Sequence, residues 1–151
     1  MKRHNSRIFV VLTMYQNDLL NQTKEKDLLE SDKIKCFDDF KAINEEEIGT
    51  YDVDIQFYQD LLNLVNKNID EIDSILKDSL VNWSFNRLAY IDRAILRVAT
   101  AEMLYTITPK EIIIDEALNI TRDYSETDDY LTVKFNNKVL DTVKEKIENG
   151  R

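Results

Sequence analysis

The chain has 151 residues, a formal net charge of −9, two glycines and one proline. This scarcity of turn residues favours an all-α fold and excludes the glycine-rich loops of nucleotide-binding enzymes. A single cysteine and a single histidine exclude an intrachain disulfide and a zinc site of the His/Cys type, and no apolar stretch approaches the roughly 20 residues of a membrane helix. We therefore expect one cytoplasmic domain over residues 1–151, without a metal, a cofactor or catalytic residues.

Apolar residues at spacings of three and four predict about seven helices along the chain. The first is expected from about residue 5 to residue 20, and the segment 21–50 gives no clear pattern beyond one or two short helices. Later helices are expected at about 52–68, 69–80, 88–105, 109–124 and 129–148. Helix starts are indicated by Asn68 with Glu71 three residues on, by Ser84 or Asn86, and by Thr108 followed by Pro109 and Glu111.

Charge is distributed unevenly along the chain. Residues 1–7 hold four basic side chains and no acid, residues 25–54 are strongly acidic, and residues 134–151 are mildly basic. Such runs are usually solvated faces. The two basic ends could also come together in the fold, and the structure decides between these possibilities.

Charged residues also lie on the inner face of the longest predicted helix. Arg93, Arg97 and Glu102 stand there among aliphatic side chains, where an unpaired charge is costly. We expect an ion pair in which Arg97 binds Glu116 of the next helix or Glu102 of its own helix. An acid–base catalytic site is the weaker interpretation, because the sequence offers no nucleophile or cofactor group beside it.

At this point the sequence resembles the NusB family of transcription antitermination factors. The matching motifs are RHNSRIFVVLTMYQ, DVDIQFYQDLLNLV, IDRAILRVATAEMLY, PKEIIIDEALNITRDY and KFNNKVLD, which begin at Arg3 and end at Asp141, and the resemblance extends to about Ile147. The resemblance implies an all-α fold of two packed small three-helix bundles. It also implies that the protein binds boxA-type single-stranded RNA together with the ribosomal protein NusE, and acts through these partners on elongating RNA polymerase.

The resemblance also implies site residues. RNA contacts are expected from the basic first motif, from the tyrosine that closes the first helix, and from the region where the last helix begins: Lys2, Arg3, His4, Arg7, Tyr15, Asp129 and Lys134. Arg87 and Asp92 are expected to contact the protein partner. This interpretation depends on the basic N-terminal segment lying near Lys134, so that one cationic groove forms on an acidic body.

Departures from the family pattern leave alternatives open. The first motif has fewer arginines than is usual in the family, which implies fewer phosphate contacts. A helical adaptor that keeps the fold and has lost RNA binding is therefore the second interpretation, and an enzyme is a distant third. Trp83 and Phe85 pack between helices or, if exposed together, form a protein-binding patch. Related proteins occur as monomers and homodimers, and the apolar stripes do not distinguish the two.

Overall fold

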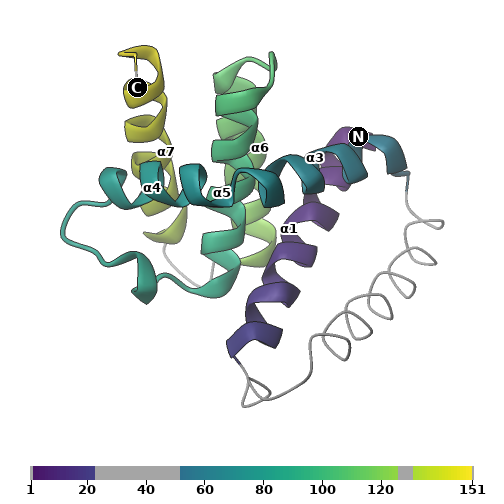
Figure 1. The fold of residues 1–151 in the computed structure, drawn as a ribbon, viewed down its shortest axis with the longest axis horizontal. Coiled ribbons are helices and arrows are strands. Elements are labelled where there is room, and N and C mark those ends of the chain that lie inside the picture. The colour runs from purple at the N-terminus through teal and green to yellow at the C-terminus, as the bar shows by residue number, and fades with distance from the viewer. Residues whose placement is uncertain (1, 23–51, 126–130, 151) are drawn as a thin grey trace.

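The computed structural model describes residues 2–22, 52–125 and 131–150, and within these ranges it is helical without strands (Figure 1). The helices are α1 (Lys2–Gln22), α3 (Ile55–Lys67), α4 (Ile69–Ser79), the short 3-10 helix η2 (Phe85–Arg87), α5 (Tyr90–Tyr105), α6 (Lys110–Tyr124) and α7 (Leu131–Glu148). The prediction of an all-α fold with about seven helices is confirmed. The expectations for residues 23–50 lie outside the described residues.

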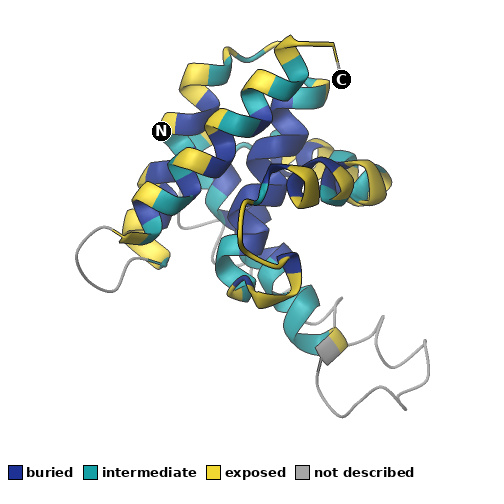
Figure 2. Cartoon of the chain, turned by 90° about the vertical axis from the view of Figure 1, so that its left-hand side faces the viewer, coloured by how far each residue is buried: buried dark blue, intermediate teal, exposed yellow. Residues whose placement is uncertain are grey.

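Helix α5 lies at the centre of the fold. It contacts α1, α3, α4, α6 and α7, and every residue from Arg93 to Met103 is buried. On one side α1 and α3 pack together on α5, and on the other side α6 and α7 do so, with α4 against both α5 and α7. Figure 2 shows the buried surfaces facing inward from each of these helices. An α-helix that is buried all round is the arrangement expected for the centre of a helical domain.

Helix starts agree only partly with the predicted caps. The Asp54 carboxylate accepts a hydrogen bond of 3.0 Å from the Phe57 amide and caps α3. Asn68 stands at the predicted cap position of α4, but its side chain donates to the Leu64 carbonyl instead. Pro109 rather than Thr108 precedes α6, and Ala89 precedes α5, so capping by Thr108, Ser84 or Asn86 was wrong for these helices.

None of the described helices combines the length and the apolar character that crossing a bilayer demands.

Candidate functional site

The first turns of α1, residues 2–7, carry the basic residues predicted to bind RNA, and we call this segment the tip. Lys2 and Arg3 are exposed. The Lys2 Nζ atom lies 3.7 Å from an oxygen of Asp52, with both side chains about two-thirds exposed. The Arg3 guanidinium lies 5.1 Å from the centre of the Phe57 ring. The charges of Lys2 and Arg3 thus lie at the surface, with that of Lys2 beside the carboxylate of Asp52.

Arg7 and His4 have partners inside the protein. Arg7 is buried and donates two hydrogen bonds to Glu102, of 2.6 Å from Nε and 2.9 Å from Nη2. Its Nη1 atom lies 3.8 Å from Glu116, which also bonds the ring of His4. The expectation that Arg7 is available to phosphate is therefore wrong, because its guanidinium neutralises a buried glutamate.

The predicted partners of Arg97 were also wrong. Arg97 donates two hydrogen bonds of 2.8 Å to Asp73 of α4 and further bonds of 3.1 and 3.2 Å to Asp18 of α1. Glu102 lies five residues along the same helix, about 140° round its axis, and so points elsewhere. Burial acts to lower the pKa of Arg97, but the hydrogen bonds and charges of Asp73 and Asp18 outweigh it and raise the pKa above its usual value.

The two acids that bind Arg97 lie on apolar stripes, where sequence reasoning missed them. Asp73 follows Ile69 by four residues and precedes Leu76 by three, and Asp18 follows Met14 by four. The sequence did contain one signal for these partners, which is a charged residue at a position of the helix that is otherwise apolar. Arg93 joins the same cluster, with Nη1 4.0 Å from Asp18 and its guanidinium over the Phe85 ring.

The tip does not lie beside Lys134. Arg7 meets α5 at Glu102, near the end of that helix, whereas Asn136 at the start of α7 meets α5 at Asp92, near its beginning. These two positions are ten residues apart, or about 15 Å along the helix axis. Figure 1 shows the start of α1 and the start of α7 well apart. Within the part of the chain that the structure describes, the tip and Lys134 therefore do not form the expected single cationic groove.

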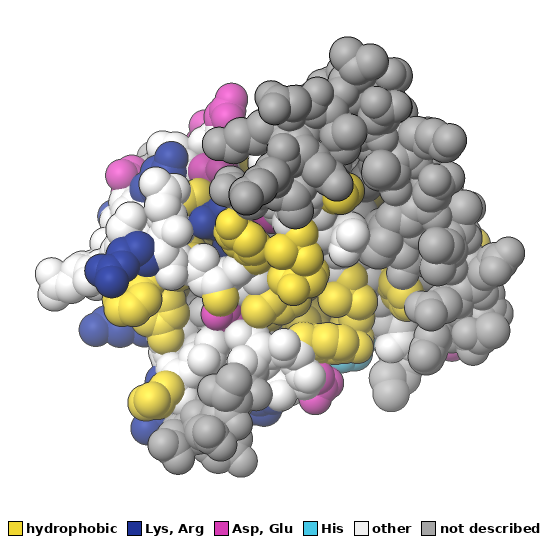
Figure 3. Space-filling view, turned by 90° about the horizontal axis from the view of Figure 1, so that it is seen from below, with side chains coloured by type: hydrophobic (Ala, Val, Ile, Leu, Met, Phe, Trp, Pro, Cys, Tyr) yellow, Lys and Arg dark blue, Asp and Glu magenta, His cyan; other side chains and the backbone are white. Residues whose placement is uncertain are grey.

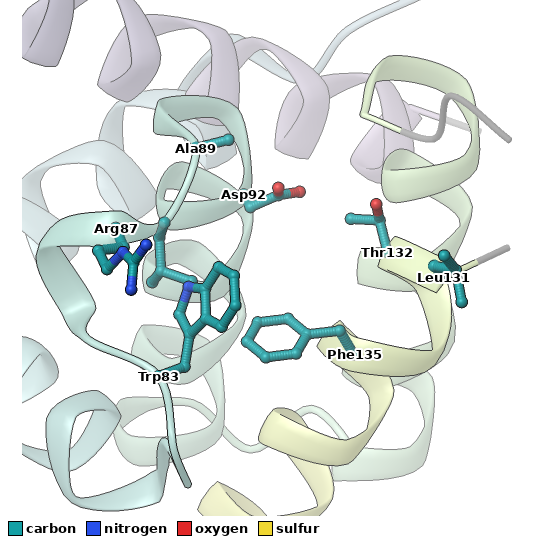
Figure 4. A pocket seen from close by; sticks show the side chains of 8 residues that line it. Trp83, Arg87, Ala89, Asp92, Leu131, Thr132 and Phe135 are labelled. Atoms are coloured by element: carbon teal, nitrogen blue, oxygen red, sulfur yellow. The ribbon is translucent and has the colours of Figure 1, made fainter.

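A cavity of about 510 Å³ opens where α7 begins, and it contains both predicted partner-binding residues. Its lining is mostly apolar and consists of Trp83, Arg87, Leu88, Ala89, Asp92, Leu131, Thr132 and Phe135. Figure 4 shows the rings of Trp83 and Phe135 next to each other in its lining, with ring centres 5.9 Å apart and planes at 62°, an edge-to-face contact. The Arg87 guanidinium lies 5.6 Å from the Trp83 ring. We call this the Trp83 cavity.

Asp92 joins three helices at the back of the Trp83 cavity. It accepts hydrogen bonds from Ser125, at the end of α6, and from Asn136 of α7. The buried Asn136 also donates to Thr121 over 3.2 Å. This network fixes the start of α7 on α5 and α6, and with it the position of Phe135.

The other predicted residues have simple positions. Trp83 is 47% exposed and Phe85 is buried, so they do not form one exposed patch. Tyr15 is partly buried against the core, and Lys134 is exposed in the first turn of α7. Asp129 lies outside the described residues.

Figure 3 shows apolar side chains gathered on the face seen from below, with Lys and Arg side chains among and beside them. Such a mixed surface is typical of binding sites for proteins or nucleic acids.

Within the described ranges, no three His, Cys, Asp or Glu side chains lie close enough together to hold a metal ion.

Comparison with known proteins gives one consistent family. A family model described as the NusB family matches residues 4–145. The transcription antitermination protein NusB of Staphylococcus epidermidis is 32% identical over 143 residues, covering 95% of this chain and 98% of that protein. The structure of T. maritima NusB has a TM-score of 0.69 at 28% identity, covering 97% of this chain and 92% of that chain.

A second solved structure, of the antitermination factors NusB and NusE in complex with dsRNA, has a TM-score of 0.72 at 23% identity and covers 97% of this chain and 99% of that chain. At that identity it shows the fold alone. The matched residues 4–145 and the likeness over nearly the whole chain establish that this protein belongs to the NusB family.

Proposed function

We propose that this protein is a transcription antitermination factor that binds boxA-type single-stranded RNA together with NusE, in the cytoplasm, and thereby acts on elongating RNA polymerase. The observation that carries the proposal is the family match over residues 4–145. The name of the Staphylococcus epidermidis relative supports it. A solved structure of the same fold is of NusB and NusE in complex with dsRNA. The family is not one of enzymes, and the protein acts by holding its partners.

The two surfaces suit two different partners. The Trp83 cavity has apolar walls, one basic side chain and one acidic side chain, which is the composition of a protein-binding site with a few orienting charges. We assign it to NusE, with Arg87 and Asp92 among its lining residues. The tip offers exposed cations and no acidic residue in the first turn of α1, which suits phosphate groups.

RNA would have to reach from the tip past α5 to contact Lys134 as well. A single strand can follow such a path because its backbone is flexible and its charges are evenly spaced. Tyr15 and Asp129 remain predicted RNA contacts. Without one cationic groove, surface charge by itself does not argue for RNA, and the proposal rests on family membership.

One observation favours a second candidate function. Only Lys2 and Arg3 of the four basic residues in the tip are exposed, since His4 and Arg7 bond glutamates. Fewer free cations mean weaker RNA binding. The alternative is therefore an adaptor of the same fold that binds NusE and has lost the RNA.

A titration separates the two functions. Fluorescently labelled boxA-type RNA is titrated with the protein, alone and saturated with NusE, at two salt concentrations. Our proposal expects binding that is tighter with NusE and weaker at high salt. An RNA of scrambled sequence and equal length is the control. NusE binding without RNA binding in either condition would leave the adaptor alone.

A further inference from the structure

The Phe57 ring, in the first turn of α3, contacts two cations of the tip. The Cζ atoms of the Arg3 and Arg7 guanidinium groups lie 5.1 and 5.2 Å from the centre of the ring, close enough for cation–π attraction. Arg7 is buried, Arg3 is exposed, and Phe57 is partly buried between these extremes. Figure 1 shows the start of α1 beside α3. The ring therefore connects the interior of the protein to a charge at its surface.

The position of the Phe57 ring is fixed by bonds within and between the helices. The Phe57 amide donates to the Asp54 carboxylate that caps α3. The Asp54 amide donates to the Ser6 hydroxyl over 3.0 Å, which ties the start of α3 to α1. The guanidinium of Arg7 is itself fixed by its two hydrogen bonds to Glu102. The ring is thus a firm support for an exposed cation.

Phe57 differs from the partners of the other cations of the tip because it carries no charge. Lys2 lies beside the carboxylate of Asp52, and Arg7 is neutralised by a glutamate. An aromatic face attracts a guanidinium group and leaves both its net charge and its in-plane N–H donors in place. In the parts of the chain that the structure describes, Arg3 has no ion pair. Its contact with Phe57 therefore orders the side chain without neutralising it.

We propose that Phe57 is a positioning residue for RNA, whose ring holds the Arg3 guanidinium in place for a phosphate group of the strand. Ordering a long side chain during binding costs conformational entropy, and a side chain that is ordered beforehand avoids most of that cost. The planar fork of N–H donors suits two oxygens of one phosphate. This inference rests on the proposed function, because RNA is the ligand that the proposed function gives to the tip. Phe57 acts through Arg3 and needs no contact with the strand.

The support of Arg3 by the ring is tested first without RNA. NMR relaxation of the 15N-labelled Nε–H groups, at mildly acidic pH, reports the motion of each arginine side chain. The Arg3 group should be restricted in the parent protein and in Phe57→Tyr, and should move freely in Phe57→Leu. The Arg7 group is the internal control, because its bonds to Glu102 should keep it rigid in all three proteins. Equal mobility of Arg3 in the parent and in Phe57→Leu would overturn the inference before any RNA is added.

The consequence for RNA is measured by a double-mutant cycle in protein saturated with NusE. The variants are Phe57→Leu, Arg3→Lys, which keeps the charge and loses the planar fork, and the two combined. Each single variant should weaken the binding of boxA-type RNA by about three- to tenfold, and the double variant should bind about as well as the weaker single variant. Phe57→Tyr keeps an aromatic face and should keep the parent affinity.

A matched variant separates this role from simple packing of α3 on α1. Leu64 is a partly buried residue of the same helix, packed against the core. Leu64→Ala should lower stability in urea unfolding and leave RNA affinity unchanged, provided that binding is measured where every variant is fully folded. A loss of affinity in Leu64→Ala as large as that in Phe57→Leu would show that Phe57 acts through stability alone and would overturn the inference.

The remaining outcomes separate this inference from the proposed function. RNA binding by the parent protein, with independent effects of Phe57→Leu and Arg3→Lys or with no effect of Phe57→Leu, overturns the positioning role and leaves the proposed function standing. A parent protein that binds no boxA-type RNA even with NusE refutes the proposed function and the positioning role together.

Discussion

The guanidinium of Arg7 binds both carboxylate oxygens of Glu102, at 2.6 and 2.9 Å, and the two side chains are 7% and 2% exposed. This bidentate pair joins the start of α1 to the end of α5. A residue from the basic motif predicted to contact RNA is thus part of the core. The arrangement separates two roles within one short segment, since Arg3 lies at the surface and Arg7 lies beneath it.

Replacing Arg7 should destabilise the fold strongly. Arg7→Met removes the cation and leaves the Glu102 carboxylate buried without its partner, which costs about 3–5 kcal/mol. Urea unfolding measures the loss. Arg3→Met is the matched control, because both guanidinium groups lie near the Phe57 ring but only Arg7 is buried. The control should change the free energy of unfolding by less than about 0.5 kcal/mol. Equal effects from the two variants would refute a structural role for Arg7.

The Arg97 cluster should respond in the same way and be partly rescued. Arg97→Met removes the cation that binds both Asp18 and Asp73 in a partly buried site, which should cost about 3 kcal/mol or more. Adding Asp73→Asn to this variant should recover part of the loss, because one stranded charge is removed. Arg122→Met, at an exposed position of α6, is the control. A double variant less stable than Arg97→Met would show that Asp73 does not depend on Arg97.

Glu111 and Lys144 give a pH-dependent contact between α6 and α7. The hydrogen bond from Lys144 Nζ, of 2.8 Å, lowers the pKa of the Glu111 carboxyl. A carboxyl with a lowered pKa stabilises the fold above its unfolded pKa and loses that effect as pH falls through the folded pKa. Glu111→Gln should therefore reduce Tm slightly near neutral pH and not at strongly acidic pH. The exposed Glu145→Gln should reduce it at neither. A larger decrease in Tm from Glu111→Gln at acidic pH than at neutral pH would contradict the lowered pKa of the Glu111 carboxyl.

Lys2 and Arg3 should determine the salt dependence of RNA binding. Each phosphate contact of a single strand contributes a slope of about −0.7 to the plot of log affinity against log salt concentration. The double variant Lys2→Gln/Arg3→Gln should make the slope shallower by about 1.4 without changing stability. Lys67→Gln, at the exposed end of α3, is the control. An unchanged slope would move the RNA contacts away from the tip.

Trp83 should be important for NusE and not for folding. Its ring forms one wall of the Trp83 cavity and is 47% exposed, as expected for an aromatic residue that becomes buried in a complex. Trp83→Ala should weaken NusE binding by about tenfold or more in calorimetry. Tyr105→Ala is the control, since Tyr105 is 39% exposed at the other end of α5. Loss of affinity in both variants would indicate a general defect instead of a local site.

The helices could be predicted from sequence because each carries its apolar stripe within a few turns. The predicted ends of 68, 80 and 105 are within one residue of Lys67, Ser79 and Tyr105. Helix caps were harder to predict: the side-chain amide of Asn68 donates to the Leu64 carbonyl of the preceding turn instead of capping α4, and Pro109 rather than Thr108 precedes α6. The local sequence pattern thus predicts the span of a helix better than the residue that caps its start.

Only those features of the site that depend on a single helix could be predicted from the sequence. Burial of charge beside α5 was predictable, because Arg97 and Glu102 lie among aliphatic residues of one helix. Their partners were not, because Asp18, Asp73 and Arg7 come from other helices and the packing angles decide which charges meet. The same dependence on packing made the expected groove between the tip and Lys134 wrong. It also hid the Trp83 cavity, whose walls come from residues 83–92 and from α7.

The central claim is that one molecule of this protein holds RNA and NusE at the same time on separate surfaces. The most direct measurement is the mass of the complex by size-exclusion chromatography with light scattering, after mixing the protein with boxA-type RNA and NusE. Our account predicts a single species that contains all three. A species with NusE and without RNA, or RNA released when NusE is added, would contradict it.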